Sequence, residues 1–225
     1  MVSDAGARDA EALEGNDLFR VLYRTGVDGN IFAGLDTRHP GLTDGRVRQA
    51  LGSAIDRDHI LEEVFRGRGR TTSLPWPTYS PAFDEVANEH YTRDIDRARQ
   101  LLAEAGGVET IPEIPVSYTA GSGSEPNIAQ YTPSTLSVSA FPFNSAKNAS
   151  NFLDDDYATD AWTVADADSP GASTIYRRLN NDLLEDAFIL ELVAPDSPLV
   201  TTSALHGVTW SKRSERDLAH AYHTE

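Results

Sequence analysis

The sequence predicts an α/β domain in which a mixed β-sheet is flanked by helices. Short apolar runs typical of strands alternate with longer segments whose apolar residues recur at helical spacing. The chain has 225 residues, of which 40% are hydrophobic and 24% are charged, the usual proportions of a globular protein. A chain of this length can bury a substantial core. We therefore expect a folded protein rather than a disordered one.

The amino-terminal part predicts one short helix and two strands. Residues 9–13 have the composition of a helix end, and the apolar residues within 18–23 indicate a strand. A second apolar group at 31–35 lies among three glycines, which is typical of a short strand that another backbone approaches closely.

Two consecutive helices are predicted next. Thr43 or Asp44 is the expected N-cap of the first, and the second has Asp58 as its expected N-cap and ends at Gly67 or Gly69. The first helix is indicated by five apolar residues that fall on one helical face: Val47, Ala50, Leu51, Ala54 and Ile55.

A proline-rich loop, a third helix and an edge strand are expected to follow. Three prolines between 71 and 83 fix the backbone and remove hydrogen-bond donors, so this segment is predicted to be an ordered loop. Asp94 is the expected N-cap of a helix that Gly106 ends. Residues 111–118 contain two prolines, and they predict a strand at the edge of the sheet.

The remainder of the chain predicts a long loop, a helix and two closing strands. Residues 120–151 have no sustained apolar period and are rich in Gly, Ser, Thr and Asn, which predicts a loop. Ser169 and Pro170 predict the N-cap and first turn of a helix. Residues 188–193 and 199–202 predict the two strands.

The acidic composition argues against nucleic acid as a partner. The chain has 35 acidic and 19 basic residues, and its net charge of −16 would repel phosphates and an anionic membrane surface. The acids are spread along the chain, and Lys147 and Lys212 are its only lysines. Because dispersed carboxylates keep a surface hydrated at high salt, we expect a halophilic source, with GC-rich coding as the alternative.

No motif in the sequence indicates an enzyme, a cofactor or a metal. The absence of cysteine excludes disulfides and thiolate catalysis, and neither a GxSxG elbow nor a P-loop is present. His220 and His223 could share a helical face and ligate a metal, but in an expected frayed terminus they are interpreted as a chance pair. The acidic run at 154–156 is interpreted as a solvated turn, because it lacks the ligand alternation and the glycine of a calcium loop. We therefore predict no catalytic residues and no cofactor.

The beginning of the sequence has no pattern of an export signal. Residues 1–14 lack a basic start, an apolar run and a cleavage site, and no stretch approaches the length of a membrane span. As written, the chain is expected to stay soluble where it is made.

Several segments resemble those of one protein family. The stretch LTDGRVRQALGSAIDRDHILEEVFRGRG at 42–69 is similar to a segment of the family 5 extracellular solute-binding proteins, which include the dipeptide and oligopeptide receptors of ABC importers. Three further stretches resemble that family in the same order: YTRDIDRARQLLAEAGG at 91–107, NASNFLDDDYATDAW at 148–162 and TIYRRLNNDLLEDAFILEL at 174–192.

The resemblance implies a fold and a division of the chain. It implies a type II periplasmic-binding-protein-like lobe, incomplete, at residues 9–210, which corresponds to the carboxyl-terminal portion of a two-lobed receptor. An internal deletion is expected near 119–135, and residues 211–225 are expected to form a tail.

The resemblance also suggests residues for ligand binding. In relatives a W-x-A-D-Y-P-D-P turn supplies a carboxylate to the terminal ammonium of the peptide, and here Tyr131 and Thr132 are the nearest match, with Thr132 in place of the acid. A threonine lacks the charge for such a bond. Trp76 and Tyr79 are expected to line the ligand cleft, with packing of the proline-rich loop as the alternative.

The implied function is that of the substrate-binding component of a peptide-type ABC importer, in truncated form. The expected partners are a peptide or other small solute and, if the chain is exported, ABC permease subunits at the extracellular face of the cell membrane. The alternative is a remnant or interaction fragment of such a receptor that binds no solute. An upstream reading frame that encodes the other lobe would favour the receptor.

Overall fold

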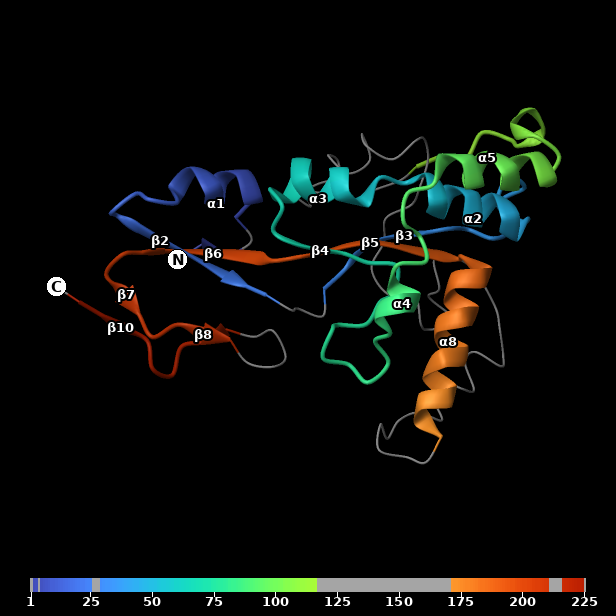
Figure 1. Cartoon of the computed structure of the whole chain (residues 1–225). Helices are drawn as coiled ribbons and strands as arrows, with labels where there is room; N and C mark the ends of the chain where they lie inside the picture. The colour runs from blue at the N-terminus through green and yellow to red at the C-terminus, as the bar shows by residue number, and fades with distance from the viewer. Residues whose placement is uncertain (1, 4, 26–28, 117–170, 211–215, 225) are drawn as a thin grey trace.

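The computed structural model describes residues 2, 3, 5–25, 29–116, 171–210 and 216–224. Strands run along the middle of an elongated body, with α1, α3, α2 and α5 on one side and α4 and α8 on the other (Figure 1). The helices are α1 (Ala7–Leu13), α2 (Gly45–Ala54), α3 (Arg57–Phe65), α4 (Glu85–Asn88), α5 (Ile95–Glu104), the 3-10 turn η1 (Val108–Thr110) and α8 (Ala172–Asp186). This arrangement confirms the predicted α/β class.

The described strands form two three-stranded sheets and two short pairs. One sheet has the order β3-β5-β4, the other has the order β1-β6-β2, and all the described pairings are antiparallel. The strands are β1 (Val2–Ser3), β2 (Phe19–Arg24), β3 (Ile31–Gly34), β4 (Gly69–Thr71), β5 (Ile189–Pro195), β6 (Ser197–Thr202), β7 (Leu205–His206), β8 (Thr209–Trp210), β9 (Arg216–Asp217) and β10 (Tyr222–His223). Because β5 and β6 are the central strands, the chain passes from one sheet directly into the other.

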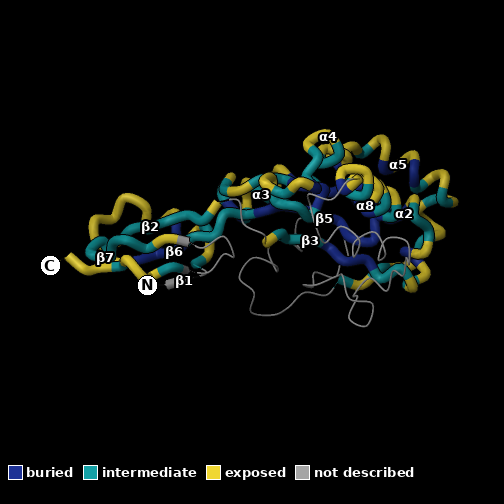
Figure 2. The backbone as a smooth tube through the Cα atoms, turned by 90° about the horizontal axis from the view of Figure 1, so that it is seen from below, coloured by how far each residue is buried: buried dark blue, intermediate teal, exposed yellow. Residues whose placement is uncertain are grey.

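Strand β5 lies at the centre of the hydrophobic core. Its residues from 189 to 194 are all buried, and Figure 2 shows the buried backbone concentrated around this strand. Helix α3 covers one side of β5, and the main core cluster joins Leu190, Leu192 and Val193 to Ile60. A strand that is covered on both faces is expected to be almost uniformly apolar, and β5 departs from this pattern at Glu191 alone.

Aspartate side chains cap the amino-terminal ends of helices α2, α3 and α5. Asp44 accepts a hydrogen bond from the backbone N–H of Arg46, and Asp94 accepts one from Arg97, as the sequence predicts. The predicted cap of α3 was wrong, because Asp56 rather than Asp58 accepts the bond from the N–H of His59. Asp58 lies inside the first turn, where its charge still favours the positive end of the helix.

Other details differ from the sequence-based prediction. Among residues 111–116 no strand forms, and 117–118 lie outside the described residues, so the predicted edge strand is not found where it can be examined. Strand β4 and helix α4 were not predicted; both lie at the ends of the proline-rich loop. The described N-cap of α8 is Gly171 in the left-handed region, while Ser169 and Pro170 lie outside the described residues.

Two arginines of the segment at 42–69 are buried and bind backbone carbonyls. Arg48 donates hydrogen bonds to the carbonyl oxygens of Leu42, Thr43 and Asp186. Arg57 donates to those of Glu191, Gly52 and Tyr91 at 2.8 to 2.9 Å. These two side chains tie α2, α3 and β5 to distant parts of the chain, so this part of the segment is structural.

We expect Gly52→Ala to destabilise the protein by about 1–2 kcal/mol. A Cβ at this position would lie 2.6 Å from the buried ring of Tyr91, whose hydroxyl donates to the carbonyl of Leu184. Overpacking of about 1–3 kcal/mol therefore outweighs the gain of up to about 1 kcal/mol from removing a helical glycine. Urea unfolding tests this, with Gly45→Ala as the control because its Cβ would meet only the Arg48 side chain, at 3.5 Å. Equal stability of Gly52→Ala and the parent protein would contradict it.

The segment expected to be a tail contains strands. Strand β10 pairs with β7, β9 pairs with β8, and the ring of His206 stacks on that of Tyr222. His220 lies in a turn and His223 in β10. Among the described residues, no group of three or more potential metal ligands comes together. The domain boundary at 210 stays a prediction.

Candidate functional site

The two sheets meet at a single residue. Asp196 separates β5 from β6, and its backbone N–H donates to the carbonyl of Arg68. Ion pairs join α1 to the turn after α3 close to this junction: Arg66 with Glu11 and Arg68 with Glu14. The guanidinium of Arg68 also lies 3.9 Å from the centre of the Tyr23 ring. The junction is therefore a place where polar side chains from both sheets gather.

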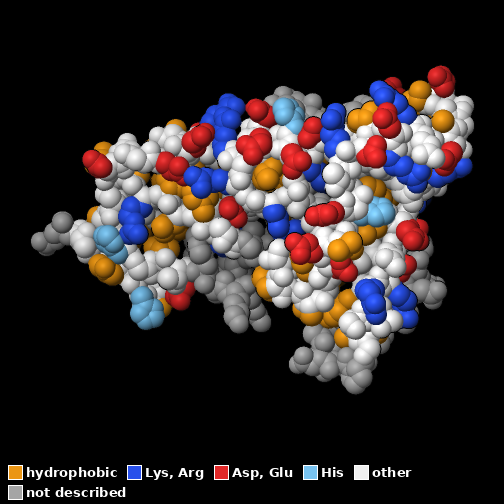
Figure 3. Space-filling view, viewed as in Figure 1, with side chains coloured by type: hydrophobic (Ala, Val, Ile, Leu, Met, Phe, Trp, Pro, Cys, Tyr) orange, Lys and Arg blue, Asp and Glu red, His pale blue; other side chains and the backbone are white. Residues whose placement is uncertain are grey.

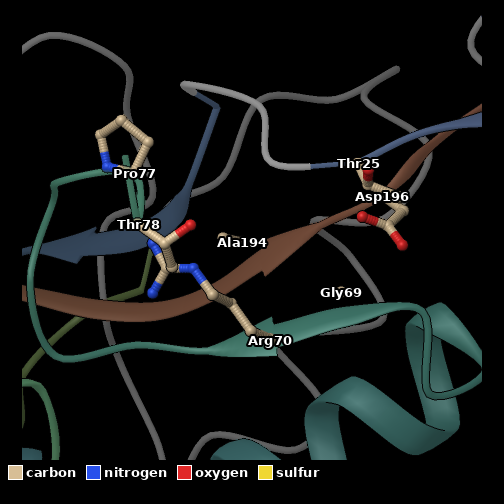
Figure 4. A pocket seen from close by; sticks show the side chains of 7 residues that line it. All are labelled: Thr25, Gly69, Arg70, Pro77, Thr78, Ala194 and Asp196. Atoms are coloured by element: carbon tan, nitrogen blue, oxygen red, sulfur yellow. The ribbon is translucent and has the colours of Figure 1, made fainter. Parts of the chain in front are cut away.

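A cavity of about 270 Å³ lies at this junction. Figure 4 shows β4 and β5 along its floor, the proline-rich loop on one side and the end of β2 on the other. Seven residues line it: Thr25, Gly69, Arg70, Pro77, Thr78, Ala194 and Asp196. Its wall thus comes from four separate segments, which the fold brings together.

Gly69 permits the close approach of β4 to β5 in the floor of the cavity. Its φ of +128° is rarely adopted by residues with a side chain. A Cβ there would lie 2.4 Å from the carbonyl oxygen of Ala194 and 2.7 Å from the Cα of Pro195. Any residue other than glycine at position 69 would therefore push the β5 backbone away from β4 in the floor of the cavity.

Arg70 provides the positive charge of the cavity. Its guanidinium extends from β4 toward Thr78, and its Nη2 donates to the carbonyl oxygen of Trp76 at 2.8 Å. The group also lies 5.3 Å from the centre of the Phe83 ring. Nη1 is shielded from solvent and has no hydrogen-bond partner among the described residues. Burial lowers the pKa of Arg70, and the nearby Glu191 carboxylate opposes this change.

Asp196 provides a negative charge beside Thr25. Burial raises the pKa of its carboxyl group, and the positive charge of Arg68 opposes the shift. The carboxylate has no hydrogen bond from the described part of the chain. Figure 4 shows the Arg70 guanidinium beside Thr78 and the Asp196 carboxylate beside Thr25. The cavity therefore has one charge of each sign at separate places.

Glu191 is a buried carboxylate close to the same arginine. It is 5% exposed, accepts a hydrogen bond from the Asn30 side chain, and has one oxygen with no partner among the described residues. Burial raises its pKa to about 7, although Asn30, Arg57 and Arg70 favour the charged form. A sequence signal for this residue exists, since it is the single charged residue in the apolar run of β5. Arg70 and Asp196 have no such signal.

The residues predicted to bind a ligand fall into two groups. Trp76 donates its indole N–H to Asn180 at 2.6 Å, and its ring packs against two core clusters. Tyr79 belongs to the same loop as Pro77 and Thr78 of the cavity wall, and it is 66% exposed. Tyr131 and Thr132 lie outside the described residues. Ligand contact by these four residues stays a prediction.

The comparison with protein families identifies the family of this chain. The family model described as bacterial extracellular solute-binding proteins, family 5 Middle, matches residues 1–167. The chain belongs to this family. Its members are extracellular solute receptors rather than enzymes. Two curated relatives are the probable di/tripeptide-binding protein 5 of Pseudomonas aeruginosa, 39% identical over 95 residues, and the heme-binding protein A of Haemophilus influenzae, 40% identical over 68 residues.

These alignments cover only part of each family member. The Pseudomonas alignment spans 41% of this chain and 16% of the relative, and the Haemophilus alignment spans 29% and 12%. The matched residues thus form a small part of the full length of these relatives.

Solved structures of family members share the fold. The ABC transporter substrate-binding protein CtaP of Listeria monocytogenes aligns with a TM-score of 0.83 and 19% identity over 99% of this chain and 55% of that protein. The oligopeptide-binding protein AppA of Bacillus subtilis, solved with a nonapeptide, aligns with a TM-score of 0.78 and 17% identity. This alignment covers 99% of this chain and 56% of that protein. The chain therefore has the type II periplasmic-binding-protein-like fold and spans about half the length of these structures. Within the described part, no helix is long and apolar enough to cross a membrane.

Proposed function

We propose that this chain forms part of the solute-binding component of a peptide-type ABC importer and corresponds to the carboxyl-terminal portion of such a receptor. The names of the relatives support a peptide ligand, since one is described as a di/tripeptide-binding protein and another structure contains a nonapeptide. The proposed partners are a peptide or other small solute and, at the extracellular face of the membrane, ABC permease subunits. No step of this function requires a catalytic residue or a cofactor.

The observation that carries this proposal is the charged cavity where the two sheets meet. The connection through Asp196 and the segment between β2 and β3 are the covalent links between the sheets near the cavity. A ligand held at such a junction contacts both sheets and stabilises the relative orientation in which it binds best. This is the behaviour required of a receptor that closes around its solute.

Thermal unfolding with a mixed pool of dipeptides and tripeptides tests this proposal. A ligand that binds only the folded state at about 100 times its Kd adds about 2.7 kcal/mol of stability. For a chain of this size each kcal/mol raises Tm by about 2–4 °C, so we expect an increase of about 5–10 °C. A cooperative transition with unchanged Tm would favour the alternative of a remnant that binds no solute. A pool of free sugars is the control ligand.

We also propose that the chain comes from a halophile, on the basis of its charge. Figure 3 shows acidic side chains dispersed over the visible face, interspersed with arginines. With a net charge of −16, mutual repulsion destabilises the compact state at low ionic strength. Raising KCl from about 0.1 M to about 2 M shortens the Debye length from about 10 Å to a few Å and is expected to raise Tm by several degrees. A lower Tm at high salt would contradict this proposal.

A further inference from the structure

We propose that Asn180, a buried residue of α8, is a positioning residue for the cavity at the junction of the sheets. Asn180 is not one of the residues that line the cavity, but it holds both ends of the proline-rich loop that forms one wall. This inference rests on the proposed function. It adds a residue that controls the strength of solute binding from outside the cavity.

One side-chain amide joins the two ends of the loop. Oδ1 of Asn180 accepts a hydrogen bond from the indole N–H of Trp76 at 2.6 Å, and Nδ2 donates to the carbonyl oxygen of Ala82 at 3.0 Å. Because an indole N–H can only donate and a carbonyl oxygen can only accept, a single orientation of the amide satisfies both partners. Asn180 is 2% exposed, so solvent has little access to these contacts. The amide therefore fixes the width of the loop at residues 76–82.

Arg70 holds the same loop from the side of β4. Its Nη2 donates to the carbonyl oxygen of Trp76 at 2.8 Å. Its guanidinium lies 5.3 Å from the centre of the ring of Phe83, the residue that follows Ala82. The beginning and the end of the loop are thus each contacted by two side chains, one from α8 and one from β4. A shift of Trp76 therefore moves the carbonyl group that fixes the guanidinium of Arg70.

The wall of the cavity begins directly after the tryptophan that Asn180 holds. Pro77 and Thr78 follow Trp76 in the chain and line the cavity, and Figure 4 shows Arg70 extending toward Thr78. The prolines of this loop restrict its backbone further. Release of the contact with Asn180 would let this wall and Arg70 leave the arrangement that receives a solute. The apparent affinity then falls in proportion to the fraction of molecules that keep this arrangement.

Amide hydrogen exchange of the full chain without ligand tests the positioning role. The test variant is Asn180→Leu, which has a similar volume and lacks polar side-chain atoms. Asn181→Leu is the matched control, because it changes the exposed neighbour on the same helix. The N–H groups of Ser80 and Phe83, which form hydrogen bonds within the loop, report on the loop. The N–H group of Thr72, which donates to a carbonyl of β5, reports on the core.

Local opening of the loop exposes its amides while the core stays folded. We expect Asn180→Leu to accelerate exchange in the loop about 10-fold more than at Thr72, the factor that corresponds to one lost hydrogen bond. Asn181→Leu should change neither. Trp76→Phe keeps an aromatic ring without the indole N–H; it should give the same selective loss and replaces Asn180→Leu if that variant does not fold. Equal acceleration in the loop and at Thr72 would mean that Asn180 only stabilises the fold, and it would overturn this inference.

Thermal unfolding with a pool of free dipeptides measures the effect on binding. If the competent fraction falls to about a tenth, binding is about 10-fold weaker. At about 100 times the Kd of the parent protein, the rise in Tm then falls to about half. The double variant with Trp76→Phe should bind no more weakly than Asn180→Leu alone, because Trp76 has no contact with residue 180 left to lose.

The parent protein separates failure of this inference from failure of the proposed function. An equal rise in Tm for the parent protein, Asn180→Leu and Trp76→Phe would contradict the positioning role and leave the proposed function intact. A further loss of binding in the double variant would show that Trp76 acts independently of Asn180, and it would also contradict this role. If the pool does not raise the Tm of the parent protein, the proposed function fails, and the role of Asn180 in binding fails with it.

Discussion

Gly69→Ala is expected to destabilise the protein by about 4 kcal/mol, the largest effect of a single methyl group that we predict. The new Cβ would lie 2.4 Å from the carbonyl oxygen of Ala194, where the obstacle is backbone and has no alternative rotamer. A φ of +128° adds backbone strain of about 1–3 kcal/mol, and overpacking adds a similar amount. Urea unfolding measures the change in the free energy of unfolding.

Gly29→Ala is the matched control for this prediction. Nothing lies within 4 Å of a Cβ at Gly29, which has no left-handed backbone conformation. This substitution should therefore leave stability within about 1 kcal/mol of the parent value or increase it slightly. If both variants unfold at the same urea concentration, the approach of β4 to β5 is not as close as the structure describes.

Gly69 also links stability to the proposed site. Its backbone and that of Ala194 form the cavity floor, so a side chain at this position would enlarge the distance between β4 and β5. A variant that still folds should bind the free dipeptide pool more weakly than Gly29→Ala does. Binding of equal strength would place the ligand away from this floor.

The main elements of the fold could be predicted because they have strong periodicity. Helices α2 and α5 each have an apolar stripe and an aspartate cap, and β5 is an apolar run bounded by turn residues. Such features depend on neighbouring residues, which the sequence displays directly. The choice between Asp56 and Asp58 as the cap of α3 was wrong because capping depends on backbone angles that either residue could have adopted.

Short elements and the cavity could not be predicted for a different reason. Strand β4 has three residues and exists because it pairs with β5, more than a hundred positions later in the chain. The cavity joins Thr25, Arg70 and Asp196 in the same way, and it includes backbone that has no sequence signal. Long-range pairing determines both strand β4 and the cavity. The aromatic residues of the proline-rich loop were predicted as ligand contacts from their residue type alone.

Glu191 shows what a local pattern can and cannot provide. Its position in an apolar strand marks it as exceptional, but only the packing of α3 and β4 brings Arg57 and Arg70 near it. Burial of this carboxyl group also raises its pKa.

The stability of the protein is expected to depend on pH through Glu191. Burial raises the pKa of this carboxyl group from 4.5 to about 7, so the folded state binds the proton more tightly than the unfolded state does. The stabilisation is fully present below about pH 4.5 and is lost as the pH rises through about 7. The loss is on the order of 3 kcal/mol, since one pKa unit corresponds to about 1.4 kcal/mol.

Glu191→Gln removes this dependence because an amide of similar shape does not titrate. The difference in unfolding free energy between the variant and the parent should therefore rise by up to about 3 kcal/mol in favour of the variant between about pH 4.5 and pH 8.5. Loss of the carboxylate near Arg57 and Arg70 would add a constant offset, so the informative quantity is the slope with pH. The exposed Glu113→Gln serves as the control and should show no such slope. Parallel pH profiles for Glu191→Gln and the parent protein would mean that this carboxyl group stays ionised in the core, held so by the two arginines.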